Sequence, residues 1–162
     1  MAETIYHVDK NDNVIGPIDR DTAHREGLLH RSGMVFLIRS DREIMLQHRS
    51  MQKKTFPDCK DASCTFHVSY GESYEQAAQR ELLEETGATS RIKYLGKFLH
   101  EDGNEHQIVA VFLTTNDSPI KIDENEATGF EFVEKKQVDQ IIAKEKVTPW
   151  LREGWKVVRE RL

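Results

Sequence analysis

The stretch Gly71–Ala88, GESYEQAAQRELLEETGA, decides the fold because it carries every signal of one helix. Ser73 followed by Gln76 resembles a capping box, and the residues after it are good helix formers. Gly87 stands where a left-handed residue would end the helix. The sequence therefore predicts a helix over residues 74–86.

Three glutamates, Glu81, Glu84 and Glu85, share one turn of this helix. At about 100° per residue their side chains fall within an arc of roughly 100°. Like charges at this spacing destabilise an isolated helix by roughly 0.2–0.5 kcal/mol per pair. A divalent ion that prefers oxygen ligands, Mg²⁺ or Mn²⁺, would neutralise them, whereas the spacing alone also fits a solvated acidic face.

The fuller pattern resembles the Nudix box, whose family form is G-x5-E-x7-R-E-U-x-E-E-x-G-U with U apolar. Its fixed positions from the first glutamate to the last glycine fall on Glu72, Arg80, Glu81, Glu84, Glu85 and Gly87. The family's first glycine falls on Phe66, which is the one departure. The resemblance implies an α/β protein of the Nudix fold, an α/β/α sandwich around a mixed β-sheet.

The resemblance also implies roles for the box residues. Glu81, Glu84 and Glu85 would be catalytic residues that hold Mg²⁺ or Mn²⁺. Glu72 and Arg80 would orient these glutamates from behind.

Length and composition predict one globular domain over residues 1–162. We expect an N-terminal hairpin and a histidine-bearing segment within 1–31, the box at 71–88, and helices within 135–162. Apolar residues make up 38% of the chain and no apolar run approaches the roughly 18 residues of a membrane span, so we expect no membrane partner and a cytoplasmic location. A net charge of −5 without a basic block gives no footprint for duplex nucleic acid. Either a monomer or a homodimer fits these properties.

Alternating and continuous apolar runs predict eight strands. They are Thr4–Asp9, Val14–Ile18, Met34–Ile38, Glu43–Gln47, Thr65–Ser69, Ile92–His100, Gln107–Thr114 and Phe130–Val133. A short helix or turn carries His24, a long loop covers 50–64, and helices are expected over Lys135–Lys144 and from Thr148–Pro149 onward.

A second resemblance extends from about Arg20 to the C-terminus. Lys53-Lys-Thr-Phe-Pro57 followed by Ser63–Ser73 is similar to the K-K-x-W-P…S-x-C-x-H-x5-G-E-S segment of type 1 isopentenyl-diphosphate isomerases, which are Nudix relatives. It implies that Arg20, Arg49 and Lys53 bind a diphosphate, for which cationic side chains are suited. Trp150 falls on an active-site tryptophan of these isomerases; it fits equally a substrate-stacking residue and a core aromatic at a helix start.

These isomerases have a further metal site, whose ligands fall on His24, His30, His67, Glu105 and Gln107. The resemblance implies a second, transition-metal ion here, because imidazole suits Zn²⁺, Mn²⁺ or Fe. Gln107 replaces a carboxylate, and the spacing from His24 to His30 is one residue shorter than in the isomerases. We therefore expect a weaker site.

The isomerases' catalytic cysteine falls on Thr65. Cys64 is adjacent, but neighbouring strand residues point to opposite faces, so it does not restore the thiol. Many Nudix hydrolases carry a general-base glutamate that falls on Glu126, with Glu124 and Glu131 as nearby alternatives.

These features predict a Mg²⁺-dependent Nudix hydrolase that cleaves a phosphoanhydride bond in a nucleoside or other organic diphosphate. An isopentenyl-diphosphate isomerase is the first alternative, opposed by Thr65 and Gln107. A non-catalytic sensor of a diphosphate ligand is the second, opposed by the complete set of box glutamates. The sequence leaves the substrate open.

Overall fold

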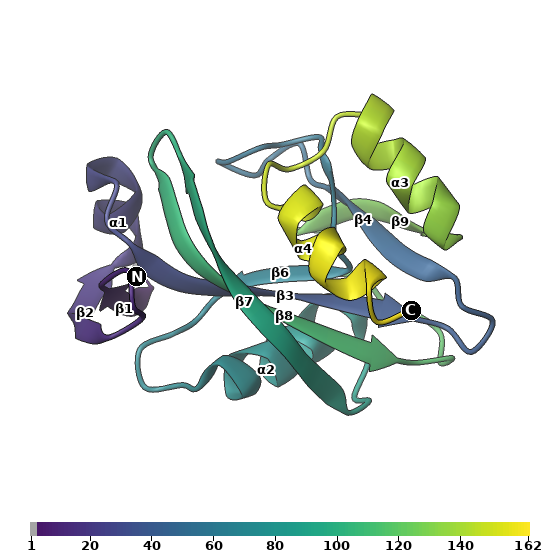
Figure 1. Cartoon of the computed structure of the whole chain (residues 1–162), viewed down its shortest axis with the longest axis horizontal. Coiled ribbons are helices and arrows are strands. Elements are labelled where there is room, and N and C mark those ends of the chain that lie inside the picture. The colour runs from purple at the N-terminus through teal and green to yellow at the C-terminus, as the bar shows by residue number, and fades with distance from the viewer. Residues whose placement is uncertain (1–2) are drawn as a thin grey trace.

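The computed structural model describes residues 3–162, which form one mixed sheet of nine strands with helices on both faces (Figure 1). The strands are β1 Thr4–Val8, β2 Val14–Asp19, β3 His30–Ile38, β4 Ile44–Arg49, β5 Lys60–Asp61, β6 Cys64–His67, β7 Ile92–Asp102, β8 Glu105–Thr115 and β9 Ala127–Val133. The helices are α1 Arg20–Glu26, α2 Tyr74–Thr86, α3 Lys135–Lys144 and α4 Leu151–Arg159. None of these helices is long and apolar enough to cross a lipid bilayer.

The helix α2 has the bounds and the caps that the sequence predicts. Ser73 Oγ accepts a hydrogen bond from the Gln76 amide at 3.0 Å, and Gln76 Oε1 accepts one from the Ser73 amide at 2.9 Å. Gly87 has a φ of 77° and donates its amide to the Leu83 carbonyl at 2.9 Å. The capping box and the left-handed stop are both confirmed.

Strand β3 organises the sheet. It runs parallel to β8 along its whole length, from His30 opposite Gln107 to Ile38 opposite Thr115, and antiparallel to β6. Strand β3 is joined to β4 by a turn, and the two strands pair antiparallel only beside it, at Ile38 and Ile44. Strand β4 pairs mainly with β9 instead, because β6 and β8 already occupy the two edges of β3.

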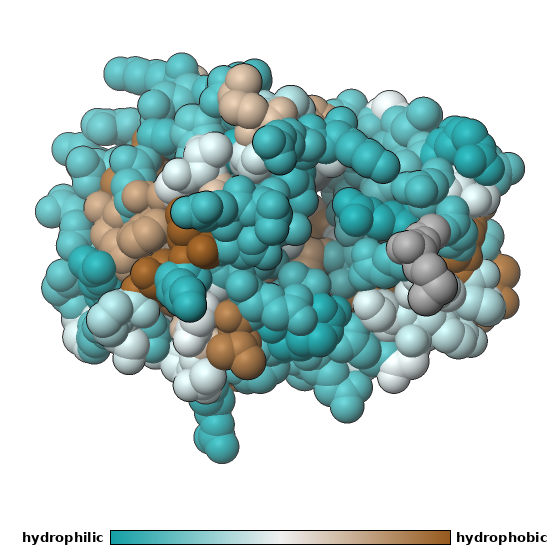
Figure 2. Space-filling view, turned by 180° about the vertical axis from the view of Figure 1, so that it is seen from behind, coloured by the Kyte–Doolittle hydropathy of each residue, from teal (hydrophilic) through white to brown (hydrophobic). Residues whose placement is uncertain are grey.

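Side chains alternate between two cores across this sheet. On one face, α2 packs over Val35, Leu37, Cys64, Phe66 and Phe112. On the other face, α3 and α4 cover a larger core that includes Met34, Phe36, Val109, Val111, Leu151 and Trp155 (Figure 1). The reverse view of the molecule is largely hydrophilic, with a larger group of apolar residues on the side away from the N-terminus and a smaller group at the edge beside it (Figure 2). The α/β/α layering is as predicted.

The bounds of some strands differ from the predictions, because distant residues in the sequence determine where these strands begin. Strand β3 begins at His30 and not at Met34, and β9 begins at Ala127 and not at Phe130. The loop over 50–64 contains the two-residue strand β5, which pairs with β4. These extensions are held by cross-strand partners that periodicity does not show.

Gly33 compensates for the phenylalanine that replaces the glycine of the box pattern. Gly33 and Phe66 are opposite each other in the β3–β6 pair. A Cβ atom on Gly33 would lie 2.5 Å from the Phe66 ring, so the ring fills the space that this glycine leaves. The missing glycine at 66 is therefore matched by one on the neighbouring strand.

Asp12, in the turn between β1 and β2, fastens the N-terminal hairpin to the rest of the fold. Its Oδ1 accepts from Arg31 Nε at 2.7 Å, and its Oδ2 accepts from Tyr74 Oη at 2.9 Å and from Lys97 Nζ at 2.7 Å. These partners lie on β3, α2 and β7. Because β2 runs directly into α1, the contact also fixes where α1 lies.

Replacing Asp12 with Asn should lower the free energy of unfolding by about 2–4 kcal/mol, because Arg31 and Lys97 lose their shared anion. Burial alone would raise the pKa of Asp12, but hydrogen bonds from Lys97, Arg31 and Tyr74 outweigh it and hold that pKa below its ordinary value. The stabilisation is therefore complete above the ordinary aspartate pKa of about 4 and is lost as pH falls through the lower folded-state value.

Urea unfolding of the two proteins across this pH range is the measurement. Asp102→Asn, in the exposed tip of the β7–β8 hairpin, is the control and should change stability little. Equal stability of Asp12→Asn and wild type at pH 7 would contradict the role of Asp12.

Candidate active site

The glutamates of α2 occupy three different environments. Glu85 is buried beneath β6, where Cys64 Sγ donates to its Oε2 at 3.1 Å. Glu81 is partly covered, and Glu84 has 54% of its side chain exposed. One glutamate of the box is thus sealed from water while another reaches into it.

Burial has a strong effect on the two inner carboxyl groups. Burial, and after it the charge of Glu81, raises the pKa of Glu85 well above its ordinary value. Burial also raises the pKa of Glu81, although hydrogen bonds from Glu85 and Arg80 oppose this. Glu85, which is sealed from water, and Glu81, which is mostly covered, are crowded together, so the donor set fits a divalent cation.

Arg80 joins the glutamates into one network. Its Nε and Nη2 donate to the two carboxylate oxygens of Glu72 at 2.8 and 2.9 Å. Its Nη1 donates to Glu81 at 2.8 Å and to Glu84 at 3.2 Å. The contact that the sequence predicts between Arg80 and the glutamates is present, and it orients two of them.

Glu126 and Lys53 form an ion pair beside the buried glutamate. Lys53 Nζ lies 2.5 Å from Glu126 Oε2, and the charge of Glu126 contributes to the raised pKa of Glu85. Glu131, an alternative general base, binds Lys60 Nζ at 2.7 Å instead, and Glu124 is exposed. The geometry favours Glu126 among the three.

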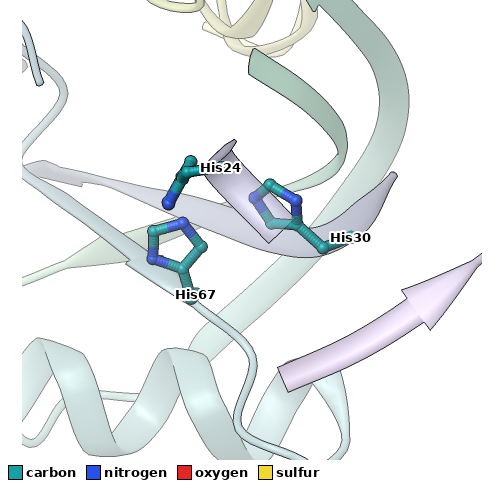
Figure 3. Close-up of side chains that lie close together, drawn as sticks. All are labelled: His24, His30 and His67. Carbon is teal, nitrogen blue, oxygen red and sulfur yellow. The ribbon is translucent and has the colours of Figure 1, made fainter. Parts of the chain in front are cut away.

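The three predicted histidines converge from α1, β3 and β6 (Figure 3). Their ring centroids are 5.1 to 5.2 Å apart, and their potential ligand atoms all lie within 4.8 Å of one another. Within residues 3–162 this is the only group of three His, Cys, Asp or Glu side chains with that spacing. The carboxylate oxygens of Glu81, Glu84 and Glu85 are not all so close to one another.

The protonation of the buried histidines suits a metal. His30 Nδ1 donates to the Leu28 carbonyl at 2.9 Å, which leaves the lone pair on Nε2. Burial lowers the pKa of His30 to about 4 and that of His67 well below its usual value, so both rings are neutral at pH 7. Among residues 3–162, neither His30 Nε2 nor His67 Nε2 has a hydrogen-bond partner. Two buried ring nitrogens without a partner thus fit a transition-metal ion.

Glu105 and Gln107 lie beside this cluster and are bonded to each other. Glu105 Oε2 is 3.6 Å from His24 Nε2. Gln107 Oε1 accepts from Ser32 Oγ at 2.6 Å, and Gln107 Nε2 donates to Glu105 Oε2 at 2.6 Å. The expectation that Gln107 makes a weaker ligand than a carboxylate stays a prediction; in this structure its oxygen accepts from Ser32. Gln107 also orients Glu105.

A cavity on the sheet face opposite α2 is lined by seven of the predicted site residues and by none of the glutamates of α2. Its lining includes Arg20, His24, Arg49, Lys53, His67, Glu105 and Trp150. Thr65 also lines it, whereas Cys64 points to the other face and Glu85. The prediction that Cys64 and Thr65 face opposite ways is confirmed.

Arg49 has less to offer a ligand than its sequence position suggests. Its side chain is buried, and its guanidinium donates to the carbonyls of Phe56 at 3.1 Å and Thr55 at 2.7 Å. It also lies 3.5 Å from Asp61 Oδ2. Arg49 therefore braces the loop between β4 and β5, and Arg20 and Lys53 are the more available cations.

Asp61 is a site residue that sequence reasoning missed. It is fully buried and accepts from Trp150 Nε1 at 3.1 Å and from Thr148 Oγ1 at 2.9 Å. Burial raises its pKa, and the charge of Arg49 opposes this. Asp61 fixes the indole of Trp150 in the cavity wall. No local signal marks it, since its partners lie far along the chain.

Comparison with known proteins agrees with the two resemblances. The family model described as NUDIX domain matches residues 28–153. Isopentenyl-diphosphate Delta-isomerase 1 of Photorhabdus laumondii is 31% identical over 163 residues, which cover 94% of this chain and 93% of that protein. An uncharacterized Nudix hydrolase of Pseudomonas aeruginosa is 29% identical, covering 82% of this chain and 79% of its own. A crystal structure of a protein from Deinococcus radiodurans superposes with a TM-score of 0.82 at 27% identity, covering 98% of each chain.

Proposed function

This chain belongs to the Nudix family, and we propose that it is a divalent-metal-dependent hydrolase that cleaves a phosphoanhydride bond in a small organic diphosphate. The observation that carries the proposal is the crowding of the buried Glu85 carboxyl group against the partly covered Glu81. The ion pair of Glu126 with Lys53 links these acids to a cationic cavity. An acidic cluster needs a cation, and a basic cavity needs an anion. A metal diphosphate supplies both.

Glu81, Glu84 and Glu85 would hold Mg²⁺ or Mn²⁺. When bound, such an ion polarises the phosphoryl oxygens and lowers the pKa of water. Arg80 would keep the glutamates in place through its bonds to Glu72, Glu81 and Glu84. The water nucleophile would give its proton to Glu126, which stands beside the buried carboxyl groups.

Arg20 and Lys53 would bind the diphosphate directly. Arg49 would add positive charge to the cavity while its guanidinium stays bonded to the loop between β4 and β5. Lys53 is paired with Glu126, so a diphosphate would compete for its ammonium group and leave the Glu126 carboxylate free. Trp150 would contact the organic part of the substrate from the cavity wall.

The histidine cluster would hold a second ion, of a metal that accepts imidazole. His24, His30 and His67 would be its ligands, with Glu105 held near by Gln107. Such an ion would link α1 to β3 and β6. This cluster therefore has a structural task that is independent of hydrolysis.

Glu85→Gln should lower kcat by about 100-fold or more, because it removes a charged ligand for the ion that activates water. Stability should hold or rise, since the substitution relieves the repulsion between Glu81 and Glu85. Steady-state hydrolysis under saturating Mg²⁺ and thermal melting are the measurements. Glu75→Gln, on the exposed first turn of the same helix, is the matched control and should keep its activity. Wild-type turnover by Glu85→Gln would show that the metal assignment is wrong.

Protein purified without an affinity tag and without chelator should contain a transition metal that His67→Ala lacks. Elemental analysis by mass spectrometry measures it. His48→Ala is the control. His48 lies on β4 and pairs with Asp58, outside the cluster, so this variant should keep the metal. A wild-type protein that takes up no Zn²⁺, Mn²⁺ or Fe²⁺ on incubation would leave the three histidines with a purely structural role.

The isomerases among the relatives make isopentenyl-diphosphate isomerisation the competing function. That reaction adds a proton at one carbon and removes one at another, so it needs two acid/base groups. Thr65 has a weakly acidic hydroxyl, and both ends of the Gln107 amide are engaged with Ser32 and Glu105. The cavity therefore lacks that pair of groups at the positions where the isomerase pattern has them.

We expect cleavage of the phosphoanhydride bond in at least one member of a panel of nucleoside diphosphates, nucleotide sugars, dinucleotides and prenyl diphosphates with Mg²⁺, measured as formation of the two product phosphates. Labelled isopentenyl diphosphate should not be isomerised, because Thr65 and Gln107 cannot exchange the protons. If dimethylallyl diphosphate forms at enzymatic rates and no panel member is cleaved, the proposed hydrolase is wrong and the protein is an isomerase. Binding of panel members without any reaction would favour the sensor.

A further inference from the structure

Strand β9 has one edge that the fold leaves free. It pairs with β4 and with no other strand among residues 3–162. Its register with β4 shifts only before Gly129, so the strand is regular from there to Val133. A free edge presents a row of backbone donors and acceptors that another strand can meet, and proteins protect such edges with lysine, proline or very short strands.

The other edges of the sheet carry this protection. Strand β2 contains Pro17, which has no N–H to offer, and β7 contains Lys93 and Lys97. Strand β5 has only two residues. The regular stretch of β9 contains neither proline nor lysine. Its free edge is therefore open to another strand.

The backbone of β9 directs Phe130 toward this free edge. Ser50, just after β4, donates its amide to the Glu126 carbonyl at 3.0 Å, on the β9 side of β4. Because backbone groups alternate in direction along a strand, His48 also turns its amide and carbonyl to β9. Gly129 is opposite His48 and points back at β4. The N–H and C=O of Phe130, the next residue, therefore point away from β4.

This edge fits a second copy of itself in antiparallel orientation. With Phe130 opposite Phe130 of the second copy, the two residues would exchange both backbone bonds, and their rings, 40% exposed in the single chain, would meet. Glu131 of the second copy would lie opposite Gly129, where an added Cβ would meet nothing within 4 Å. That space belongs to a hollow of about 330 Å³ over β4 and β9, which Lys60 also lines. The carboxylate would thus enter beside a cation.

The charges at the two ends of β9 match the same arrangement. Asp123 and Glu124 precede the strand, and Lys135 and Lys136 follow it. Antiparallel pairing places the acidic end of each strand beside the basic end of the other, and a two-fold axis makes both contacts at once. Parallel pairing would bring the acidic ends together. The charge pattern therefore favours a second copy of this chain as the occupant of the edge.

We propose that the protein forms a homodimer in which two β9 strands pair antiparallel about Phe130 and join the two sheets into one. Pairing of two seven-residue strands makes a small interface, so the dimer forms weakly and dissociates on dilution. This association needs neither metal nor diphosphate. It is therefore independent of the proposed hydrolysis.

Sedimentation equilibrium from about 1 to about 500 µM protein measures the association. The mass of wild type should rise from one copy to two across this range. Phe130→Pro should weaken dimerisation by at least about 10-fold, because proline removes the outward N–H at the centre of the pairing. Its melting temperature should change little, since that N–H takes no part in the β4–β9 ladder.

Exchange of charges tests the antiparallel orientation. Glu124→Lys and Lys136→Glu should each weaken the dimer by at least about 5-fold, because each creates two contacts between like charges. An equimolar mixture of the two variants should associate as wild type does, since every contact again joins opposite charges. Glu160→Lys and Lys93→Glu make the same changes in net charge at exposed positions outside β9 and are the matched controls, which should dimerise normally.

A disulfide tests the register. Phe130→Cys should form a cross-linked dimer on mild oxidation, because opposite Cα atoms of such a pair are about 5.5 Å apart. Thr128→Cys, two residues along the same strand, is the control. Its two copies would be roughly 13 Å apart, so it should cross-link far less.

A mass of one copy at the highest concentration would overturn the proposal and leave the edge free or open to a strand of another protein. A dimer that neither Phe130→Pro nor the charge variants weaken would overturn it as well, because it would use another surface. If Phe130→Pro does not fold, the mixture of charge variants decides, since both substituted side chains are exposed. Failure of the mixture to associate would then exclude antiparallel pairing.

Discussion

The buried carboxyl group of Glu85 is the constraint on which the candidate site depends. Its place beneath β6 excludes water, and Glu81 stands beside it on the same helix turn. A charge in such a place is costly unless other groups compensate for it. Arg80 supplies part of the compensation through Glu81, and it is itself fixed by two bonds to Glu72. The proposed cation at this helix would supply the rest of the compensation.

Strand β6 lies between the glutamates of α2 and the cavity, and its side chains contact both. Cys64 contacts Glu85 on the α2 face, while Thr65 and His67 face the cavity. This division follows from the period of two along a strand. It also explains why Cys64 cannot replace a thiol at position 65. The ion pair of Lys53 with Glu126 joins the cavity to these glutamates, because Lys53 lines the cavity and the charge of Glu126 acts on Glu85.

Local signals in the sequence were sufficient for the elements and for the motif residues. The capping box and Gly87 fixed both ends of α2, and the turn after β1 fixed the N-terminal hairpin. The predictions failed or were silent where the partner lies far along the chain. Ser32 and Gln107 are 75 residues apart, and Asp61 and Trp150 are 89 apart, so no window of sequence shows that they bond. The role of Gln107 and the existence of the Asp61 contact required the tertiary structure.

The position of the histidine cluster links the N-terminal part of the chain to the cavity. Helix α1 is held at one end by the hairpin that Asp12 fastens, and it carries His24 to within ligand distance of His30 and His67. A metal held by all three would therefore join α1 to β3 and β6 and keep Arg20, the first residue of α1, at the cavity. This linkage would need no proton transfer. The cluster is thus compatible with a hydrolase, in which it would shape the diphosphate pocket while the glutamates of α2 supply the chemistry.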